Sequence, residues 1–485
     1  MIAVSDKFLE IVKSNVRPPI KPVITVQGED ANGKNVFLTW KSNDIIDMSY
    51  KRGIDPTGQT LPYMELTWKE FYFGKLNAQN YPEKYDNVAK YMAVSLSFTQ
   101  EIKKLNIWEE FKNTTWETLK NLTWRELFKS DNSETVYFPT MFLVARPVVE
   151  GHTITWTARD LLYFLNENVL HCFHSGIQWK NHLRWLLLNE IGNFSRNFDI
   201  VDGLLSSNND IKNSTLTSLN RDAVGIIVFE GNTKNLLKNF ALVQNFYLDF
   251  SGNKIVPKDF IALVRSSSKI PVFKFTKKIM REQPKLTRNT DISSFSMKRY
   301  YVQEKTDEQY QLEPAEVLTY EDTNGNSFNY GKYIYKGWGR STAQSSKLGG
   351  FISKDAWSKI TEGEDSSITV TPVEINGIIE TWDNTDKKTA GEIYVEDNPL
   401  NYLGYAEPAS VQKKLSLNLW HSSDKYSVEL NSLSNVALEM GDLVEVETNL
   451  YDNSGNFLTK RAVIVGIEMT YNGTLKQKTL LHEVI

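Results

Sequence analysis

His171, Cys172 and His174 lie close together, and their types and spacing suggest two kinds of chemistry. On a helix, His171 and His174 stand at i and i+3, so both imidazoles face one metal ion. His182 follows nearby, but no second cluster supplies the remaining ligands, and satisfied histidines at a helix end are the favoured interpretation. Cys172 as a nucleophile has weak support because catalytic partners normally come from distant segments. The alternative for Cys172 is a buried thiol that packs as a small hydrophobic group.

Carboxylates are the other residues that could carry a reaction. Glycoside hydrolysis needs two of them at a set separation across a sugar cleft, and no pair among the 59 Asp and Glu residues stands out. No nucleophile elbow, phosphate-binding loop or dinucleotide fingerprint is present, since Gly337-Trp338-Gly339-Arg340 lacks the third glycine and a strand-to-helix frame. The sequence therefore nominates no catalytic residue, cofactor or metal site.

Tryptophan recurs every eight residues in one part of the chain, at Trp108, Trp116 and Trp124. Such a series could form an aromatic platform for sugars or bases. The favoured interpretation is a set of short helical turns that pack their own Trp rings, because aromatic residues dominate ordinary cores.

A basic stretch follows further along the chain, with Glu282 as its only acid. One interpretation is a groove for nucleic-acid phosphates. The favoured one is a charged face that pairs with an acidic neighbouring subunit, because the formal net charge of the chain is −4. The basic residues are Arg265, Lys269, Lys274, Lys277, Lys278, Arg281, Lys285 and Arg288.

Composition bounds the class of protein. A chain of 485 residues suggests about three domains. With 55 basic and 59 acidic residues it is not a dedicated nucleic-acid binder, and with 41% hydrophobic residues it is not mainly disordered. A single cysteine permits no intramolecular disulfide. No secretory leader is visible and no apolar run approaches the ~20 residues that span a bilayer, so we expect no membrane insertion.

Strand and turn patterns dominate both ends of the chain, and helical patterns dominate the middle. The front carries a hairpin at 23–26 and 36–40 and strands at 45–50 and 61–73. The back carries a tight hairpin around Asn376-Gly377 and a meander of strands at 443–451, 462–471 and 474–484. Between them we expect helices from Thr157 to Cys172 and at 178–191, a strand at 223–229 and a helix through 236–240.

These patterns predict an α+β, multidomain fold in which a small antiparallel sheet or barrel at the front and a β meander at the back flank a mixed α+β middle region. That both β regions are antiparallel β-barrels is implied by the resemblance described next. The predicted regions are a first β-barrel region at 1–104, an α+β region with the Trp repeats at 105–317, a Gly/Ser-rich connecting region at 318–365 and a second β-barrel region at 366–485.

Several segments, in this order, resemble the tail hub or baseplate hub proteins of long-tailed bacteriophages. The segment from Asn43 to Leu66, with Asp55-Pro56-Thr57-Gly58-Gln59-Thr60-Leu61-Pro62 within it, is similar to their first barrel. The segment Thr155-Trp156-Thr157-Ala158-Arg159-Asp160-Leu161-Leu162 and the Trp repeats look like the elements that follow that barrel. The segments Gly441-Asp442-Leu443-Val444-Glu445-Val446 and Ala462-Val463-Ile464-Val465-Gly466-Ile467 look like their second barrel.

The resemblance implies a structural virion protein that is not an enzyme, with two tail-tube-like barrels per subunit. In hubs of this family, three copies make a ring of six barrels that joins the sixfold tail tube to a threefold tip or spike. The ring forms part of the channel for the tape-measure protein and DNA. The implied partners are two further copies of the chain, a tail tube or distal tail protein, a tip or spike protein, the tape-measure protein and, transiently, phage DNA. The implied location is the virion tail, after assembly in the host cytoplasm.

Two turns are expected to shape contacts between barrels or between subunits, and ordinary turn chemistry within one barrel is the alternative. Their residues are Asp55, Pro56, Gly58 and Pro62 in the first turn and Gly441 and Asp442 in the second. Two other functions stay open. One is a cell-wall glycan-cleaving tail enzyme that uses Trp residues as sugar platforms, and the other is a receptor module that binds a polysaccharide without cleaving it.

Overall fold

The computed structural model describes residues 2–102, 133–175, 226–402 and 425–484, with short gaps inside these ranges. The Trp repeat and the predicted helix at 178–191 lie outside the described residues. The gaps are 15–17, 31–32, 56–57, 59, 77–81, 83–84, 86, 165–169, 232, 245, 253, 260–269, 290–291, 313–316, 322–326, 332–341, 344–349, 353–356, 363–367, 384–391, 452–453 and 456.

Most of the described chain is β-structure, and strands from both ends form one sheet of 15 strands. From the front come β1 (Ile20–Glu29), β2 (Asn35–Lys41), β3 (Asp47–Gly53), β4 (Tyr63–Phe71), β5 (Ala93–Glu101), β6 (Ser133–Tyr137), β7 (Met141–Leu143), β8 (Val148–Glu150) and β9 (Thr153–Arg159). From further along come β14 (Phe273–Phe275), β15 (Lys285–Arg288), β25 (Tyr426–Ser432), β26 (Leu443–Tyr451), β27 (Phe457–Tyr471) and β28 (Leu475–Glu483).

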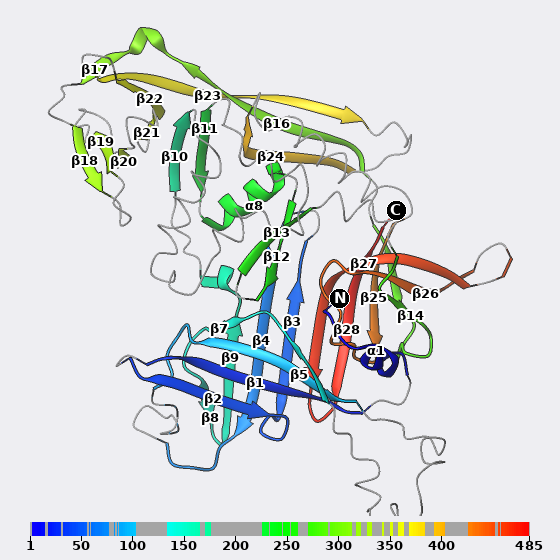
Figure 1. Cartoon of the computed structure of the whole chain (residues 1–485). Coiled ribbons are helices and arrows are strands. Elements are labelled where there is room, and N and C mark those ends of the chain that lie inside the picture. The colour runs from blue at the N-terminus through cyan, green and yellow to red at the C-terminus, as the bar shows by residue number, and fades with distance from the viewer. Residues whose placement is uncertain are drawn as a thin grey trace, which may run out of the picture.

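The main path of this sheet runs β15-β25-β28-β27-β3-β4-β9-β7-β5-β1-β2 (Figure 1). Its neighbours are antiparallel, and the parallel pair is β14 with β26 at the side of the path. The two ends of the path, β2 and β15, do not pair with each other in the part of the chain that the structure describes. The sheet is therefore open, and closure into two barrels stays a prediction.

The other described elements form smaller units. In Figure 1 a seven-stranded sheet lies at the top, and α8 (Thr233–Gln244) lies with β12 and β13 between it and the large sheet. That sheet contains β16 (Ile292–Glu304), β17 (Tyr310–Leu312), β20 (Thr342–Ala343), β21 (Gly350–Ile352), β22 (Trp357–Glu362), β23 (Ile368–Asp383) and β24 (Glu392–Tyr402). Three strand pairs are β10 (Leu170–Ser175) with β11 (Ile226–Gly231), β12 (Phe246–Ser251) with β13 (Lys254–Asp259), and β18 (Val317–Glu321) with β19 (Ser327–Gly331).

Alternation along the strands explains the core of the large sheet. In β4, Met64, Leu66 and Trp68 are buried while their sequence neighbours are more exposed, which is the period of two that a half-buried strand requires. Trp156 of β9 is the direct partner of Trp68, and the two indole rings stack with centroids 5.6 Å apart. The aromatic content of the sequence is therefore used, at least in this region, for core packing.

The predicted helix from Thr157 to Cys172 is wrong. Its first residues belong to β9, residues 161–164 form a short 3-10 turn, and residues 170–175 form β10. The antiparallel ladder between β4 and β9 runs from Glu65–Arg159 to Phe71–Thr153. A ladder of this length, with β-branched residues in β9, outweighs the helix-capping pattern at Thr157.

The predicted tight hairpin at Asn376-Gly377 is also wrong. β23 runs straight through this dipeptide, and β16 pairs with it through Tyr301–Asn376 and Tyr300–Gly377. The long partner strand binds the backbone groups that a turn would have used, so tertiary pairing outweighs the local turn preference.

Other predicted elements are confirmed within a few residues. They are the front hairpin, the strands that became β3 and β4, the C-terminal meander of β26, β27 and β28, and the helix through 236–240, which is part of α8. Helix α1 (Asp6–Lys13) was not predicted. Its signal is Ser5, whose hydroxyl accepts from the backbone N–H of Phe8 (3.2 Å), together with the buried pair Phe8 and Val12 one turn apart.

Candidate functional site

The two ends of the chain meet where β3 pairs with β27. This antiparallel ladder runs from the Gly53–Gly466 pair to the Met48–Tyr471 pair. On its other edge the same part of β27 pairs with β28. Strands that are distant in sequence thus belong to one continuous sheet, and the junction fixes how the two β regions of the chain sit side by side (Figure 1).

A β-bulge lies at this junction. The register between β27 and β28 shifts between Ile464 and Gly466, and β27 pairs with β26 before the shift and with β3 after it. The carbonyl of Val465, inside the shift, accepts a hydrogen bond from the N–H of Ile54 (2.9 Å). Bulges of this kind redirect a strand, and here the redirected strand changes its partner.

The second turn singled out by the sequence binds to this part of β27, and the residue just before the first turn does so too. The N–H of Gly441 donates to the carbonyl of Ile464 (2.8 Å), and the N–H of Ile464 donates to the carbonyl of Asp442 (3.0 Å). The first turn begins immediately after Ile54, which binds Val465. The structure therefore brings the two predicted turns together, one on each side of the same bulge.

The first turn is organised by Asp55. Its carboxylate Oδ2 accepts from the N–H of Thr60 (2.9 Å) and from the Thr60 hydroxyl (3.3 Å), and its carbonyl accepts from the N–H of Gly58 (2.9 Å). Gly58 has φ +73°, which favours glycine. Pro62 is buried ahead of β4, and Pro56 lies outside the described residues.

The second turn is organised by Asp442. Its Oδ2 accepts from the N–H of Glu439 (2.8 Å), and Gly441 has φ +80°. Burial raises the pKa of the Asp442 carboxyl above its ordinary value. A place for either turn at a subunit interface stays a prediction.

A buried ionic cluster ties a third segment to the junction. Arg52 of β3 donates from Nη2 to Asp249 Oδ1 (2.7 Å) and to the carbonyl of Phe250 (2.8 Å), and Lys258 donates to Asp249 Oδ2 (2.6 Å). Asp249 is fully buried. Burial alone would raise the pKa of Asp249, but the charges of Arg52 and Lys258 outweigh it and hold that pKa below its ordinary value. The β12–β13 hairpin is thereby anchored to β3.

The candidate metal-binding residues lie on a strand and not on a helix. His171, Cys172 and His174 lie in β10, paired with β11, so the helical i, i+3 spacing does not apply to them. Within the described ranges, no three His, Cys, Asp or Glu side chains group where they could hold a metal ion. Over the same ranges, no helix combines the length and apolar character needed to cross a membrane.

The described part of the basic stretch lies along the edge of the sheet. Lys274 of β14 lies 3.5 Å from the carboxylate of Glu447 on β26, and the N–H of Lys277 donates to the same carboxylate (3.1 Å). An acid of the same chain therefore faces part of the stretch. Arg265 and Lys269 are not among the described residues.

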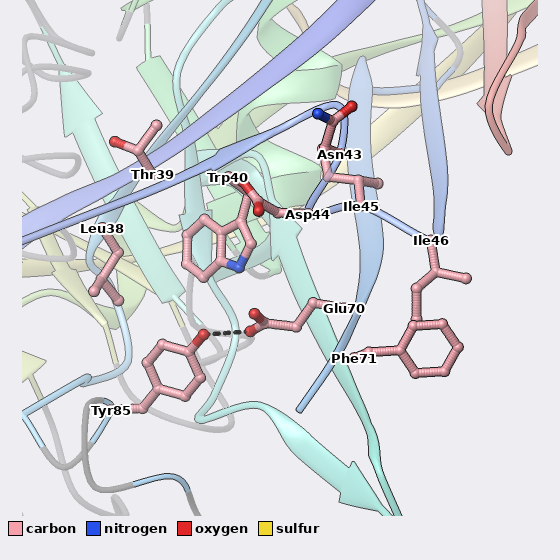
Figure 2. Close-up of a pocket in the computed structure, with 10 residues that line it drawn as sticks. All are labelled: Leu38, Thr39, Trp40, Asn43, Asp44, Ile45, Ile46, Glu70, Phe71 and Tyr85. Carbon is pink, nitrogen blue, oxygen red and sulfur yellow. Dashed lines mark hydrogen bonds between the residues drawn. The ribbon is translucent and has the colours of Figure 1, made fainter. Parts of the chain in front are cut away.

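A pocket of about 510 Å³ lies where β2 and β4 end (Figure 2). No motif pointed to it, because its walls come from separate segments. The available signal was Glu70, a charged residue at an inward position of an otherwise apolar alternation in β4. The lining residues are Leu38, Thr39, Trp40, Asn43, Asp44, Ile45, Ile46, Glu70, Phe71 and Tyr85.

Comparison with solved structures finds similar chain arrangements in tail proteins. This chain is similar to the tail protein from Neisseria meningitidis MC58 (9% identity, 95% of this chain and 96% of that chain, TM-score 0.45). It is also similar to the 43 kDa tail protein of prophage MuSo2 from Shewanella oneidensis (10% identity, 96% of this chain and 98% of that chain, TM-score 0.45). A third similarity is to a chain of the lidded Francisella PdpA-VgrG complex (10% identity, 97% of this chain and 53% of that chain, TM-score 0.43). No protein-family model and no curated protein matches the sequence.

Proposed function

We propose that this chain is a structural subunit of a bacteriophage tail hub, with no enzymatic activity. The junction between β3 and β27 carries the proposal, because it joins a front and a back β region side by side within one subunit. Two of the segments that resemble hub proteins, 43–66 and 441–467, lie in these same two regions. A subunit with two such regions gives six in a trimer, and this number matches the sixfold symmetry of a tail tube.

In this proposal the chain divides near residues 104, 317 and 365, and its two terminal β regions act as tail-tube-like barrels. Three copies form a ring between the tail tube or distal tail protein and a threefold tip or spike. The ring forms part of the channel that the tape-measure protein and then DNA pass through. Its specificity comes from symmetry-matched surfaces rather than from a catalytic pocket, and its location is the tail of a virion assembled in the host cytoplasm.

The ends of the large sheet support association between copies. Each of β2 and β15 has one strand neighbour in the described part of the chain, so each presents one unpaired edge there. Open edges are a liability that proteins pair or cover. Edge pairing between different surfaces of neighbouring copies is heterologous, and such contacts generate a closed ring when the rotation between copies closes.

The mass in solution and the shape of the particle test this proposal. We expect three copies of the 55.7 kDa chain in light scattering at high concentration, and a ring with a central hole in negative-stain images. A chain that stays monomeric in the presence of its tail partners would contradict the trimer. Sustained cleavage of purified cell wall, lost on substitution of one Asp or Glu, would contradict the non-enzymatic role.

A further inference from the structure

The outer ends of β26 and β27 leave the large sheet as a two-stranded arm. In the described chain, residues 447–451 and 457–459 pair only with each other, whereas β14 joins β26 before Glu447 and β28 joins β27 after Arg461. Figure 1 shows this arm extending away from the body of the sheet. A ribbon of two strands is marginally stable by itself and needs packing against further structure.

The arm carries two exposed aromatic rings with a cation beside them. Tyr451 is 61% exposed and Phe457 is 44% exposed, and their ring centroids lie 4.7 Å apart. The ammonium of Lys277, which follows β14, lies over the Phe457 ring at 2.9 Å from its centroid. No carboxylate pairs with this ammonium among the described residues. Exposed aromatic rings of this kind are typical of contacts between proteins.

The outer face of β1 and β2 carries complementary groups. Trp40 of β2 is buried in the core, so the period of two along the strand places Phe37 on the opposite face, where it is 67% exposed. Gln27 of β1 is the direct partner of Phe37, and Glu29 lies two residues further along β1 on the same face. Side chains at such diagonal positions lie about 7–8 Å apart. Within the described ranges, no cation pairs with the exposed Glu29.

β2 is the less protected of the two open edges of the large sheet. Its seven residues include no proline and pair with β1 without a register shift. β15, at the other end of the path, has four residues and carries a charge at each end, on Lys285 and Arg288. Short length and charge protect a free edge, whereas a longer, regular edge beside an exposed phenylalanine needs a cover.

The arm and the β1–β2 face lie on opposite sides of one copy. In Figure 1 the arm leaves the large sheet at the right, and β1 and β2 lie at the lower left. Along the path of the sheet, β3, β4, β9, β7, β5 and β1 separate β27 from β2. The two surfaces therefore do not meet within one copy. Between neighbouring copies they can meet as the two different surfaces of a head-to-tail contact.

We propose that the arm of one copy packs on the outer face of β1 and β2 in the next copy. Tyr451 and Phe457 cover Phe37 and the adjacent edge of β2. Lys277 pairs with Glu29 of the neighbouring copy. Opposite charges beside the aromatic rings favour a second copy of this chain over an unrelated protein. This inference rests on the proposed hub role, because it names the contact that joins neighbouring subunits.

Chemical crosslinking locates the contact. Phe37→Cys and Tyr451→Cys are made separately in the Cys172→Ser background and are mixed with a bismaleimide that has a hexane spacer. We expect a covalent dimer in the mixture and none with either variant alone. The matched control is Tyr137→Cys, because Tyr137 is 70% exposed on β6 of the same front region. It should give no dimer with Tyr451→Cys.

Charge reversal tests the ion pair. Lys277→Glu and Glu29→Lys should each weaken association by at least about fivefold, and the two changes in one chain should restore it, because opposite charges face each other again. Phe37→Ala should also weaken association by at least about fivefold, since it truncates an aromatic anchor. Lys278→Glu is the matched control, since Lys278 is exposed next to Lys277. Sedimentation over a range of concentrations measures these effects.

Mass and crosslinking together separate this inference from the hub role. A trimer that forms without the crosslink between Phe37→Cys and Tyr451→Cys overturns the inference and leaves the hub role standing. A crosslink in open chains of copies, without a trimer, supports the contact and contradicts the hub role. A monomer without the crosslink overturns both. The inference also fails if Tyr137→Cys crosslinks equally well, if Lys278→Glu weakens association as much as Lys277→Glu, or if the combined charge reversal does not restore association.

Discussion

Gly53 of β3 and Gly466 of β27 are direct partners in the ladder that joins the front and back of the sheet. Both positions are crowded. A Cβ atom at Gly466 would lie 2.9 Å from Leu480 Cδ1, and one at Gly53 would lie 2.5 Å from Cε1 of Tyr63. Tyr63 is 44% exposed and its ring can turn toward solvent, whereas Leu480 is held on β28 beside the bulge. The junction therefore depends more on the glycine of β27.

Gly466→Ala should lower the free energy of unfolding by about 1–3 kcal/mol, the range for overpacking a filled site. Gly53→Ala should cost less because the Tyr63 ring can move away. Urea denaturation of the two variants measures the difference. The double variant Gly466→Ala with Leu480→Ala should lose less stability than the sum of its parts, and an additive result would contradict the contact.

The Arg52–Asp249 pair should dominate the attachment of the β12–β13 hairpin. Asp249→Asn leaves the Arg52 guanidinium buried without its counter-charge, and we expect a loss of about 3–5 kcal/mol in the free energy of unfolding. Lys258→Met should cost only about 0–1 kcal/mol, because the Lys258 side chain is 37% exposed and its charge is solvated. Hydrogen exchange in β12 should rise in the first variant. Equal losses in both variants would contradict the dominant role of Arg52.

Local patterns in the sequence predict the strands that pair with their neighbours in the chain. The front hairpin and the meander at the back fall into this group, and Asn472-Gly473 turns the chain between β27 and β28 with Gly473 at φ +95°. The same dipeptide type at Asn376-Gly377 does not turn, because β16 supplies a long partner strand from a distant segment. Turn preference decides the structure only where no such partner competes.

The candidate sites also differ in whether they depend on local sequence patterns or on pairing between distant strands. Local composition predicts Asp55 and Gly441 as turn residues, but it does not predict that both turns lie beside the same part of β27, because this depends on the β3–β27 pairing. The Arg52–Asp249 pair and the pocket around Glu70 join residues from separate strands for the same reason. A single sequence carries no direct signal for pairings of this kind.

Asp160 should make stability depend on pH. Its carboxylate accepts from the N–H of Met64 (2.8 Å) and of Tyr163 (3.1 Å), yet burial raises the pKa to about 6. The folded state therefore binds the proton more tightly than the unfolded state, in which the pKa is about 3.9. The stability that this carboxyl contributes is fully present below about pH 4 and is lost as the pH rises through about 6.

Melting temperatures of the unaltered chain and of Asp160→Asn between pH 4 and pH 7 measure this effect. Because asparagine does not titrate, the unaltered chain should gain stability relative to the variant as the pH falls from 7 to 4. The gain over this range should reach about 2 kcal/mol, since each pKa unit is worth about 1.4 kcal/mol and the unfolded carboxyl is still partly ionised at pH 4. A difference that stays constant over this range would contradict the raised pKa.

The two turns beside the bulge should be energetically coupled. Asp55→Ala removes the acceptor for Thr60, and Asp442→Ala removes the acceptor for the N–H of Glu439, so each should cost about 1 kcal/mol. The second turn binds Ile464 of β27, and Ile54, immediately before the first turn, binds Val465, so loosening one turn should already disturb the part of the strand that the other borders. We expect the double variant to depart from additivity by at least about 0.5 kcal/mol.

Asp30 provides the control for this coupling. It accepts from the N–H of Lys34 (2.8 Å) in the loop between β1 and β2, a similar role in a turn that does not contact β27 in the described structure. Asp55→Ala combined with Asp30→Ala should be additive within about 0.3 kcal/mol. If both double variants are additive, the turns act separately. If trimer formation falls in Asp55→Ala at a temperature where the fold is intact, the first turn also contacts a neighbouring subunit, as the resemblance to hub proteins implies.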